Sequence, residues 1–192
     1  MLRWIFVLML IGCMDTPITY VRHPASSAAP KRVIPVAIDI NFSPEQKQQL
    51  QAAISEWNYS LNGQMRLDIY VDHFNMETDT ISYIYNARGF MILLVSRYGS
   101  VMFNLSDENR AISTGVGNGH EIYFLKEKVA LDRIKPVAMH EIGHILGAYH
   151  RPTGLMRHED DPVAHSCIDY ETIKQVAEYN GLDAETMNWC QH

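Results

Sequence analysis

Three histidines late in the chain have the spacing of a metal site that can support hydrolysis. Residues 140–150 read H-E-x-x-H-x-x-G-x-x-H. On a helix, His140 and His144 are one turn apart, so both imidazoles lie on the same face and can bind one ion. Gly147 can adopt the left-handed conformation that reverses the chain and brings His150 round as a third ligand. Three protein ligands leave the fourth position of a zinc ion open, as in catalytic sites.

Glu141 follows the first histidine and supplies the motif with a base. A carboxylate that reaches water at the metal can accept its proton. The five fixed positions occur by chance with a frequency on the order of 10⁻⁴ in a chain of this length, with average composition as the reference. The alternative is a buried helix whose histidines are only hydrogen-bonded, and it leaves the base and the third histidine unexplained. The motif therefore predicts one catalytic Zn²⁺ on His140, His144 and His150.

The motif resembles that of the metzincin clan of zinc endopeptidases, which also have a methionine turn after the third histidine. Gly154-Leu155-Met156 is similar to that turn. The resemblance implies that Met156 packs beneath the metal-binding histidines as a supporting residue. It also implies an α+β zincin domain with a mixed, mostly parallel sheet, a backing helix, an active-site helix and a small C-terminal subdomain. Arg151 differs from the residues that the better-known branches have there, so no subfamily is assigned.

Three polar residues near the motif have less specific signals. His158 stands where some metzincins have a tyrosine that stabilises the transition state, so it is a candidate donor or extra ligand, with an exposed loop histidine as the alternative. Tyr149 is interpreted as a packing residue. The matrixin loop that binds structural zinc and calcium is not recognisable, and His120 alone does not restore it. We interpret His120 as exposed polar surface.

The first residues have the composition of a secretory signal. Within residues 1–12, Arg3 precedes an apolar run that is too short to span a bilayer. The run ends at Leu10-Ile11-Gly12-Cys13, which resembles the lipobox of bacterial lipoproteins and implies a lipid anchor on Cys13. A signal without lipidation, followed by a chance cysteine, is the alternative. The resemblance predicts a lipid-anchored protein of the bacterial cell envelope, and Met14 implies the outer membrane if the cell has one.

The remaining chain is divided into a tether and one domain. Residues 13–32 contain scattered prolines and a Ser-Ser-Ala-Ala run, so we expect a lipid anchor and flexible tether there. Residues 33–192 are expected to form the catalytic domain, since 47% hydrophobic content can bury a core. A net charge of −6 without a Lys/Arg cluster argues against nucleic acid as a partner. We expect a monomer that acts on a peptide or protein substrate.

Hydrophobic patterns predict the elements that position the metal helix. Strands are predicted at 33–40, 66–71, 90–95, 110–116 and 121–125, and helices at 44–58, from 136 onwards, and at 169–179. Ser43-Pro44-Glu45-Gln46 combines a capping residue, a first-turn proline and a capping-box glutamine. The continuously apolar 90–95 is typical of a central strand, whereas the alternating 66–71 is typical of a strand near an edge. The resemblance implies an antiparallel edge strand that pairs with substrate, and 110–116 is the candidate.

Two cysteines remain after Cys13. In an oxidising compartment, Cys167 and Cys190 are expected to form a disulfide that fixes the C-terminal tail. Two buried free thiols are the alternative.

Two other function classes are compatible with a histidine motif. A catalytically inactive, metal-dependent binding or adhesion lipoprotein would keep the fold, but it would not need the base Glu141. A metal scavenger would use many histidines, but only three of the nine have ligand spacing. The sequence therefore favours a zinc-dependent endopeptidase, in which water attacks the peptide bond and Glu141 transfers its proton.

Overall fold

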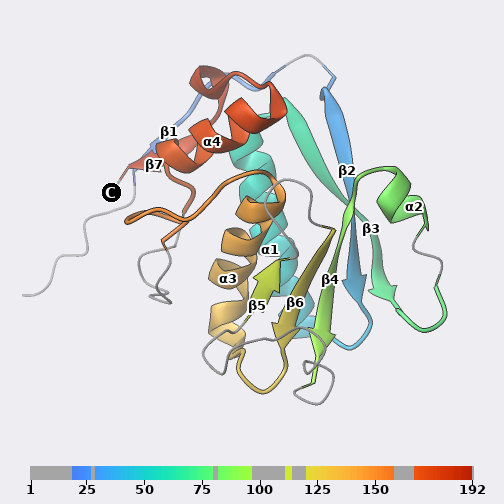
Figure 1. Ribbon diagram of the computed structural model, residues 1–192. Coiled ribbons are helices and arrows are strands. Elements are labelled where there is room, and N and C mark those ends of the chain that lie inside the picture. Colours follow the sequence, from blue (N-terminus) through green and yellow to red (C-terminus); the bar gives the residue numbers. More distant parts are fainter. Residues whose placement is uncertain are drawn as a thin grey trace, which may run out of the picture.

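The computed structural model describes residues 19–26, 29–79, 82–96, 111–113, 120–157 and 167–191. A five-stranded sheet lies at its centre, and β1 and β7 pair separately (Figure 1). The strands are β1 (Thr19–Val21), β2 (Arg32–Asp39), β3 (Met65–Phe74), β4 (Phe90–Val95), β5 (Ala111–Ser113), β6 (Glu121–Leu125) and β7 (Trp189–Gln191). The helices are α1 (Pro44–Leu61), α2 (Ser82–Asn86), α3 (Leu131–Ile145), α4 (Tyr170–Asn180) and a 3₁₀ turn (Ala184–Thr186).

The central sheet has the order β3-β2-β4-β6-β5. Its first four strands are parallel, and β5 pairs antiparallel with β6. This confirms the predicted α+β class with a mixed, mostly parallel sheet. As expected, β4 is the middle strand and is buried along nearly its whole length, whereas β3 lies at one edge. β5 forms the other edge and contains residues 111–113 of the predicted 110–116 strand, whose remaining residues lie outside the described part of the chain.

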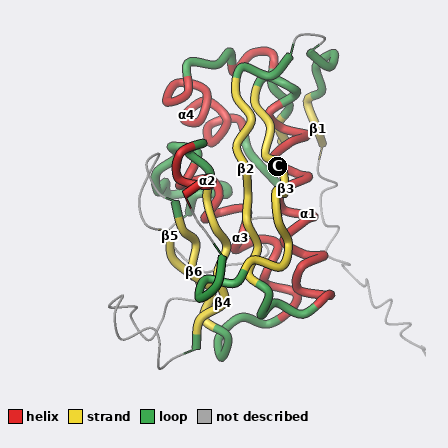
Figure 2. Tube along the Cα trace, turned by 90° about the vertical axis from the view of Figure 1, so that its right-hand side faces the viewer, coloured by secondary structure: helices red, strands yellow, loops and turns green. Residues whose placement is uncertain are grey.

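Helices cover both faces of the central sheet unequally. α1 and α3 pack together against one face (Figure 2). The main core lies there and includes the fully buried Trp57 and Phe124. The other face has a small second cluster, in which Ile84 of α2 packs with Phe74 and Met91. The sequence analysis did not predict α2, because five residues are too few to show helical periodicity. The metal helix therefore lies on the more deeply covered face.

The start of α1 follows from its capping residues. Ser43 Oγ accepts a hydrogen bond from the Gln46 N–H, while the Ser43 N–H donates to Gln46 Oε1. This confirms the predicted capping box, with Pro44 in the first position. The helix continues to Leu61, three residues beyond the predicted end, and stops where Asn62 adopts a left-handed conformation with φ 47°.

The metal helix begins earlier than predicted. We expected Pro136 to be its first residue, but α3 starts at Leu131 and contains Pro136 in its second turn. A proline there cannot donate the backbone hydrogen bond to the carbonyl of Asp132, and its ring crowds that carbonyl. Ile134, in the preceding turn, is fully buried in the main core. Burial of that side chain offsets the lost hydrogen bond, so tertiary packing decides where the helix begins.

The interpretation of residues 13–32 as a flexible tether is wrong for residues 19–26. β1 pairs antiparallel with β7, with Tyr20 opposite Cys190. The His23 N–H donates to Asn188 Oδ1 at 2.7 Å, and its ring packs edge-on against Trp189. The folded domain therefore includes residues before 33. A three-residue strand whose partner is near the far end of the chain has no local sequence signal.

The C-terminal region agrees with its prediction. α4 has Asp169 as its N-cap and the left-handed Gly181 as its C-cap, and its inner stripe of Ile173, Val176 and Ala177 is buried. A disulfide joins Cys167, just before α4, to Cys190 in β7, with 6.1 Å between the two Cα atoms. No helix in the described residues is long and apolar enough to cross a membrane.

The disulfide should contribute substantially to stability. It closes a loop with a sequence separation of 23, for which the chain-entropy model gives about 3 kcal/mol. We expect Cys167→Ala/Cys190→Ala to lower the free energy of unfolding by about this amount in urea titrations. Oxidised protein that is denatured without reductant should incorporate no alkylating reagent at either cysteine. Stoichiometric alkylation of both residues would contradict the prediction.

Candidate metal centre

Three imidazole nitrogens converge at the end of α3. His140 and His144 project from successive turns, and His150 reaches them from the segment that follows the helix. His150 Nε2 lies 3.3 Å from His140 Nε2 and 3.1 Å from His144 Nε2. The ligand atoms of all three residues lie within 4.8 Å of one another. The structure thus brings together the three histidines that the motif predicted.

Two backbone carbonyls orient the histidines of α3. His140 Nδ1 lies 2.8 Å from the carbonyl oxygen of Leu155, and His144 Nδ1 lies 2.8 Å from that of Ala148. A carbonyl only accepts hydrogen bonds, so each Nδ1 carries the proton and donates it. Each Nε2 then carries a lone pair that is directed at the other histidines. This Nδ1-protonated tautomer is the one that binds a metal through Nε2.

The separations between these nitrogens fit a tetrahedral zinc ion. Bonds of about 2.0–2.1 Å to two ligands of a tetrahedron place the ligand atoms about 3.3 Å apart. The observed 3.1 and 3.3 Å agree with this value. Burial lowers the pKa of His144, and the nearby His150 lowers it further, against an opposing hydrogen bond to Ala148. The lowered pKa favours the neutral imidazole, which is the form that binds metal.

Gly147 turns the chain immediately after α3. Its φ is +102°, its N–H donates to the His144 carbonyl, and the next N–H, of Ala148, donates to the Gly143 carbonyl. This is the Schellman pattern of a helix end. A Cβ at Gly147 would also lie 2.4 Å from the ring of Tyr179. Only glycine fits this turn, which directs His150 to the other two histidines and the Ala148 carbonyl to His144.

Met156 lies directly beneath the metal-binding face. It is fully buried, and its Sδ would be 2.6 Å from a Cβ placed on Gly143, the residue before His144. Trp57 closes the same space, and its indole N–H donates to the Met139 carbonyl at 3.0 Å. The helix, the indole and the thioether are in close contact. This arrangement agrees with the supporting role expected for Met156.

The sequence analysis missed Asp169 as a residue of this site. Besides capping α4, its carboxylate accepts the Leu155 N–H at 2.9 Å and forms an ion pair with Arg151 at 3.0 Å. It therefore holds the peptide segment whose carbonyl orients His140. A Cβ at Gly154 would lie 2.4 Å from the carboxylate, so glycine is needed there too. The sequence pattern placed Asp169 only at the start of the predicted helix 169–179, because its other partners come from a separate segment.

The remaining predicted residues have different outcomes. Glu141, directly after His140, is 8% exposed. Tyr149 is 61% exposed, so its interpretation as a packing residue is wrong. His120 is half-buried, with its ring edge-on to Tyr85 and its Nδ1 bonded to the Gly89 carbonyl, so it is not the exposed surface residue expected. His158 and Cys13 lie outside the described residues.

Comparisons with known proteins identify the fold. No family model and no curated protein matches the chain. Its structure is similar to metalloproteinase-II from Bacteroides fragilis, with a TM-score of 0.51 and 14% identity over 86% of this chain and 59% of that one. High choriolytic enzyme 1, a hatching enzyme zinc-protease from Oryzias latipes, has a TM-score of 0.37 and 18% sequence identity over 71% of this chain and 56% of that one. Myroilysin has a TM-score of 0.37 and 14% sequence identity over 64% of this chain and 50% of that one. The first likeness shows that the chain has the fold of a metalloproteinase, of which it spans little more than half.

The role of Asp169 can be tested against a second aspartate cap. Asp169→Ala removes a helix cap and leaves Arg151 without its carboxylate, so we expect the free energy of unfolding to fall by about 2–3 kcal/mol. Because the Leu155 carbonyl loses its support, zinc affinity should fall about 10-fold to 100-fold. Both are measured by denaturant titration and by competition with a chelator.

Asp183 is the matched control. It caps the 3₁₀ turn through the Glu185 N–H and is exposed. Asp183→Ala should lower the free energy of unfolding by about 1 kcal/mol and leave zinc affinity unchanged. Equal zinc affinity in the Asp169→Ala and wild-type proteins would show that this carboxylate does not support the site.

Proposed function

We propose that this protein is a zinc-dependent endopeptidase with one catalytic Zn²⁺ on His140, His144 and His150. The observation that carries the proposal is the convergence of three Nε2 atoms, two of them on imidazoles whose Nδ1 protons are held by backbone carbonyls. A zinc ion there would supply a Lewis acid that activates water and polarises the peptide carbonyl. The fold of a metalloproteinase supports the same conclusion.

Glu141 has the chemistry of the general base. It follows the first ligand on α3 and is almost fully buried, so its carboxylate acts where bulk water is limited. In the proposed reaction it accepts the proton of the attacking water and then delivers that proton to the leaving amine. The transfer is balanced within one turnover and requires no covalent intermediate. A protein that only bound metal or partner would not need this base.

The edge of the central sheet supports a peptide as the substrate. β5 is the terminal strand, and it lies beside α3. An edge strand has backbone N–H and C=O groups that an extended peptide can pair with, so the peptide would run next to the metal helix. We propose that β5 aligns the substrate in this way.

Two substitutions separate metal binding from catalysis. We expect Glu141→Gln to keep one bound zinc but to lower the turnover number by about 10²-fold to 10⁴-fold, because the amide cannot accept the proton. His144→Ala should instead lose the metal, since two ligands remain. The measurements are zinc stoichiometry and cleavage of an unbiased peptide library, with activity removed by chelator and restored by zinc.

The same experiment tests the alternative function. A wild-type protein that binds zinc but cleaves no peptide, or a Glu141→Gln variant as fast as wild type, would contradict the hydrolytic mechanism. The metal-dependent binding lipoprotein would then be the better description.

His158 remains a hypothesis, and an unchanged turnover number in His158→Ala would leave it without a catalytic role.

We further propose that Cys13 is lipidated and anchors the protein to a membrane of the bacterial cell envelope. The support is the Leu10-Ile11-Gly12-Cys13 resemblance to a lipobox. Because the thioether forms on the cysteine sulfur, Cys13→Ser should abolish metabolic labelling with fatty acid and release the protein from membranes. Label that persists in Cys13→Ser would show that the anchor is elsewhere or absent.

A further inference from the structure

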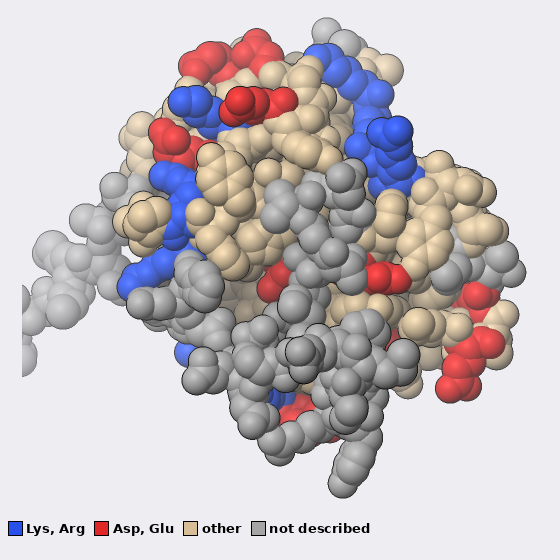
Figure 3. All heavy atoms as spheres, in the orientation of Figure 1, with Lys and Arg blue, Asp and Glu red and all other residues tan. Residues whose placement is uncertain are grey.

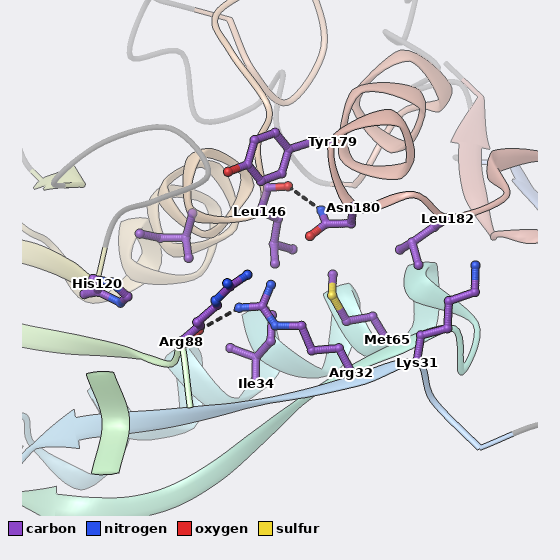
Figure 4. A pocket seen from close by; sticks show the side chains of 11 residues that line it. Lys31, Arg32, Ile34, Met65, Arg88, His120, Leu146, Tyr179, Asn180 and Leu182 are labelled. Atoms are coloured by element: carbon purple, nitrogen blue, oxygen red, sulfur yellow. Dashed lines mark hydrogen bonds between the residues drawn. The ribbon is translucent and has the colours of Figure 1, made fainter. Parts of the chain in front are cut away.

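A cavity lies at the C-terminal end of α3, and none of the three histidines lines it. It has a volume of about 560 Å³. Its polar lining includes Lys31 and Arg32 at the start of β2, Arg88 before β4, His120 before β6, and Asn180 at the end of α4 (Figure 4). Aliphatic side chains of β2, β3 and α3 complete the walls. The volume suits a small organic molecule rather than a single inorganic ion.

The charge of this cavity is opposite to that of the whole protein. Three of its lining residues are Lys or Arg, and none is Asp or Glu, although the chain has a net charge of −6. Within the described residues, no carboxylate forms an ion pair with Lys31, Arg32 or Arg88. Figure 3 shows a band of Lys and Arg side chains at the upper right, with no acidic side chain within it. The cavity therefore has uncompensated positive charge.

Arg32 and Arg88 both line the cavity, and the Arg32 guanidinium contacts the backbone of Arg88. Figure 4 shows the side chains of Arg32 and Arg88 pointing toward one another from opposite sides, and Arg32 Nη2 donates to the Arg88 carbonyl at 2.9 Å. Burial lowers the pKa of Arg32, and the charge of Arg88 lowers it further. Two adjacent cations repel each other, and an anion between them would remove that repulsion and bind through both forks.

The backbone places Arg88 in this position against its conformational preference. Arg88 has a φ of +52°, in the left-handed region, at the turn that ends α2. Its N–H donates to the Tyr85 carbonyl, and the Gly89 N–H donates to that of Ile84, as in a Schellman turn where glycine is preferred. The glycine of this turn is Gly89, one residue after the left-handed position. A side chain is excluded at Gly89, since a Cβ there would lie 2.3 Å from the Pro35 carbonyl oxygen. A non-glycine residue in this conformation is a feature that recurs at ligand sites.

We propose that this cavity binds a small organic polyanion, with one carboxylate or phosphate group between Arg32 and Arg88. Lys31 lines the same cavity, and its ammonium group donates one hydrogen bond, to the Gly181 carbonyl, at 2.9 Å. It thus has further donors for a second anionic group of the ligand. The site contains none of the three histidines, and it is independent of the proposed peptidase function.

Binding can be measured by isothermal titration of the full-length protein with pyrophosphate and with glutarate, which separate phosphate from carboxylate recognition. We expect one saturable site for at least one of these probes, and tighter binding of that probe than of inorganic phosphate. Arg88→Gln should lower the affinity for the bound probe at least about tenfold, because a charge-assisted pair of hydrogen bonds is lost. The Arg88 side chain makes no hydrogen bond in the described structure, so its removal should leave folding unaffected.

Arg66→Gln is the matched control. Arg66 is exposed on β3, pairs with Asp68 and does not line the cavity. This variant should bind the probe like wild type. Binding of a probe to zinc at the histidines would be common to wild type and Arg88→Gln, so only the difference between them reports on the cavity. Arg88→Lys keeps the charge without the fork and should give an intermediate affinity.

Two results would overturn the proposal. One is equal probe affinity in wild type and Arg88→Gln, which would place the bound anion elsewhere. The other is inorganic phosphate binding as tightly as both probes, which would show a simple anion site. If Arg88→Gln does not fold, Arg32→Lys takes its place: it keeps one donor for the Arg88 carbonyl, and unchanged affinity in that variant would equally contradict the bidentate arrangement.

Discussion

The metal centre depends on the hydrogen bonds that the imidazoles of His140 and His144 donate from Nδ1, on the side of each ring away from the other histidines. A helix can bring His140 and His144 to one face, but it does not determine which nitrogen of each ring carries the proton. The carbonyls of Leu155 and Ala148 determine this by accepting from Nδ1. Both carbonyls lie after the helix, in the segment that turns back at Gly147. The site therefore requires the path of that segment as much as it requires the helix.

The returning segment is held by contacts with the last part of the chain. Its own closure comes from the Arg151 N–H, which donates to the Met156 carbonyl at 2.7 Å. Asp169 then ties the Leu155 N–H and the Arg151 side chain to the first turn of α4. The disulfide from Cys167 and the pairing of β7 with β1 connect this region to the beginning of the folded chain. A series of direct contacts thus joins both ends of the domain to the segment that holds the histidines.

Sequence reasoning succeeded where the signal was local. The capping box at Ser43, the apolar run of β4 and the histidine spacing each depend on residues within a few positions of one another, and each was predicted correctly. It failed where the deciding contact is distant in sequence. Packing of Ile134 starts α3 before its proline, and β7 orders residues that read as a tether. Asp169 belongs to the same group, because a capping residue gives no sign of a second partner fourteen positions earlier.

The end of α3 is shared by the metal centre and the basic cavity. On one side, Gly147 directs His150 to the other histidines. On the other, Asn180 Nδ2 donates to the Leu146 carbonyl at 2.8 Å, and the Tyr179 ring lies too close to Gly147 to admit a Cβ. Asn180, Tyr179 and Leu146 all line the cavity. Because these groups are in contact, the last turn of α4 is mechanically connected to the turn that orients His144. Any effect of a bound anion on metal affinity would follow this path, and linkage requires that the metal change anion affinity by the same factor.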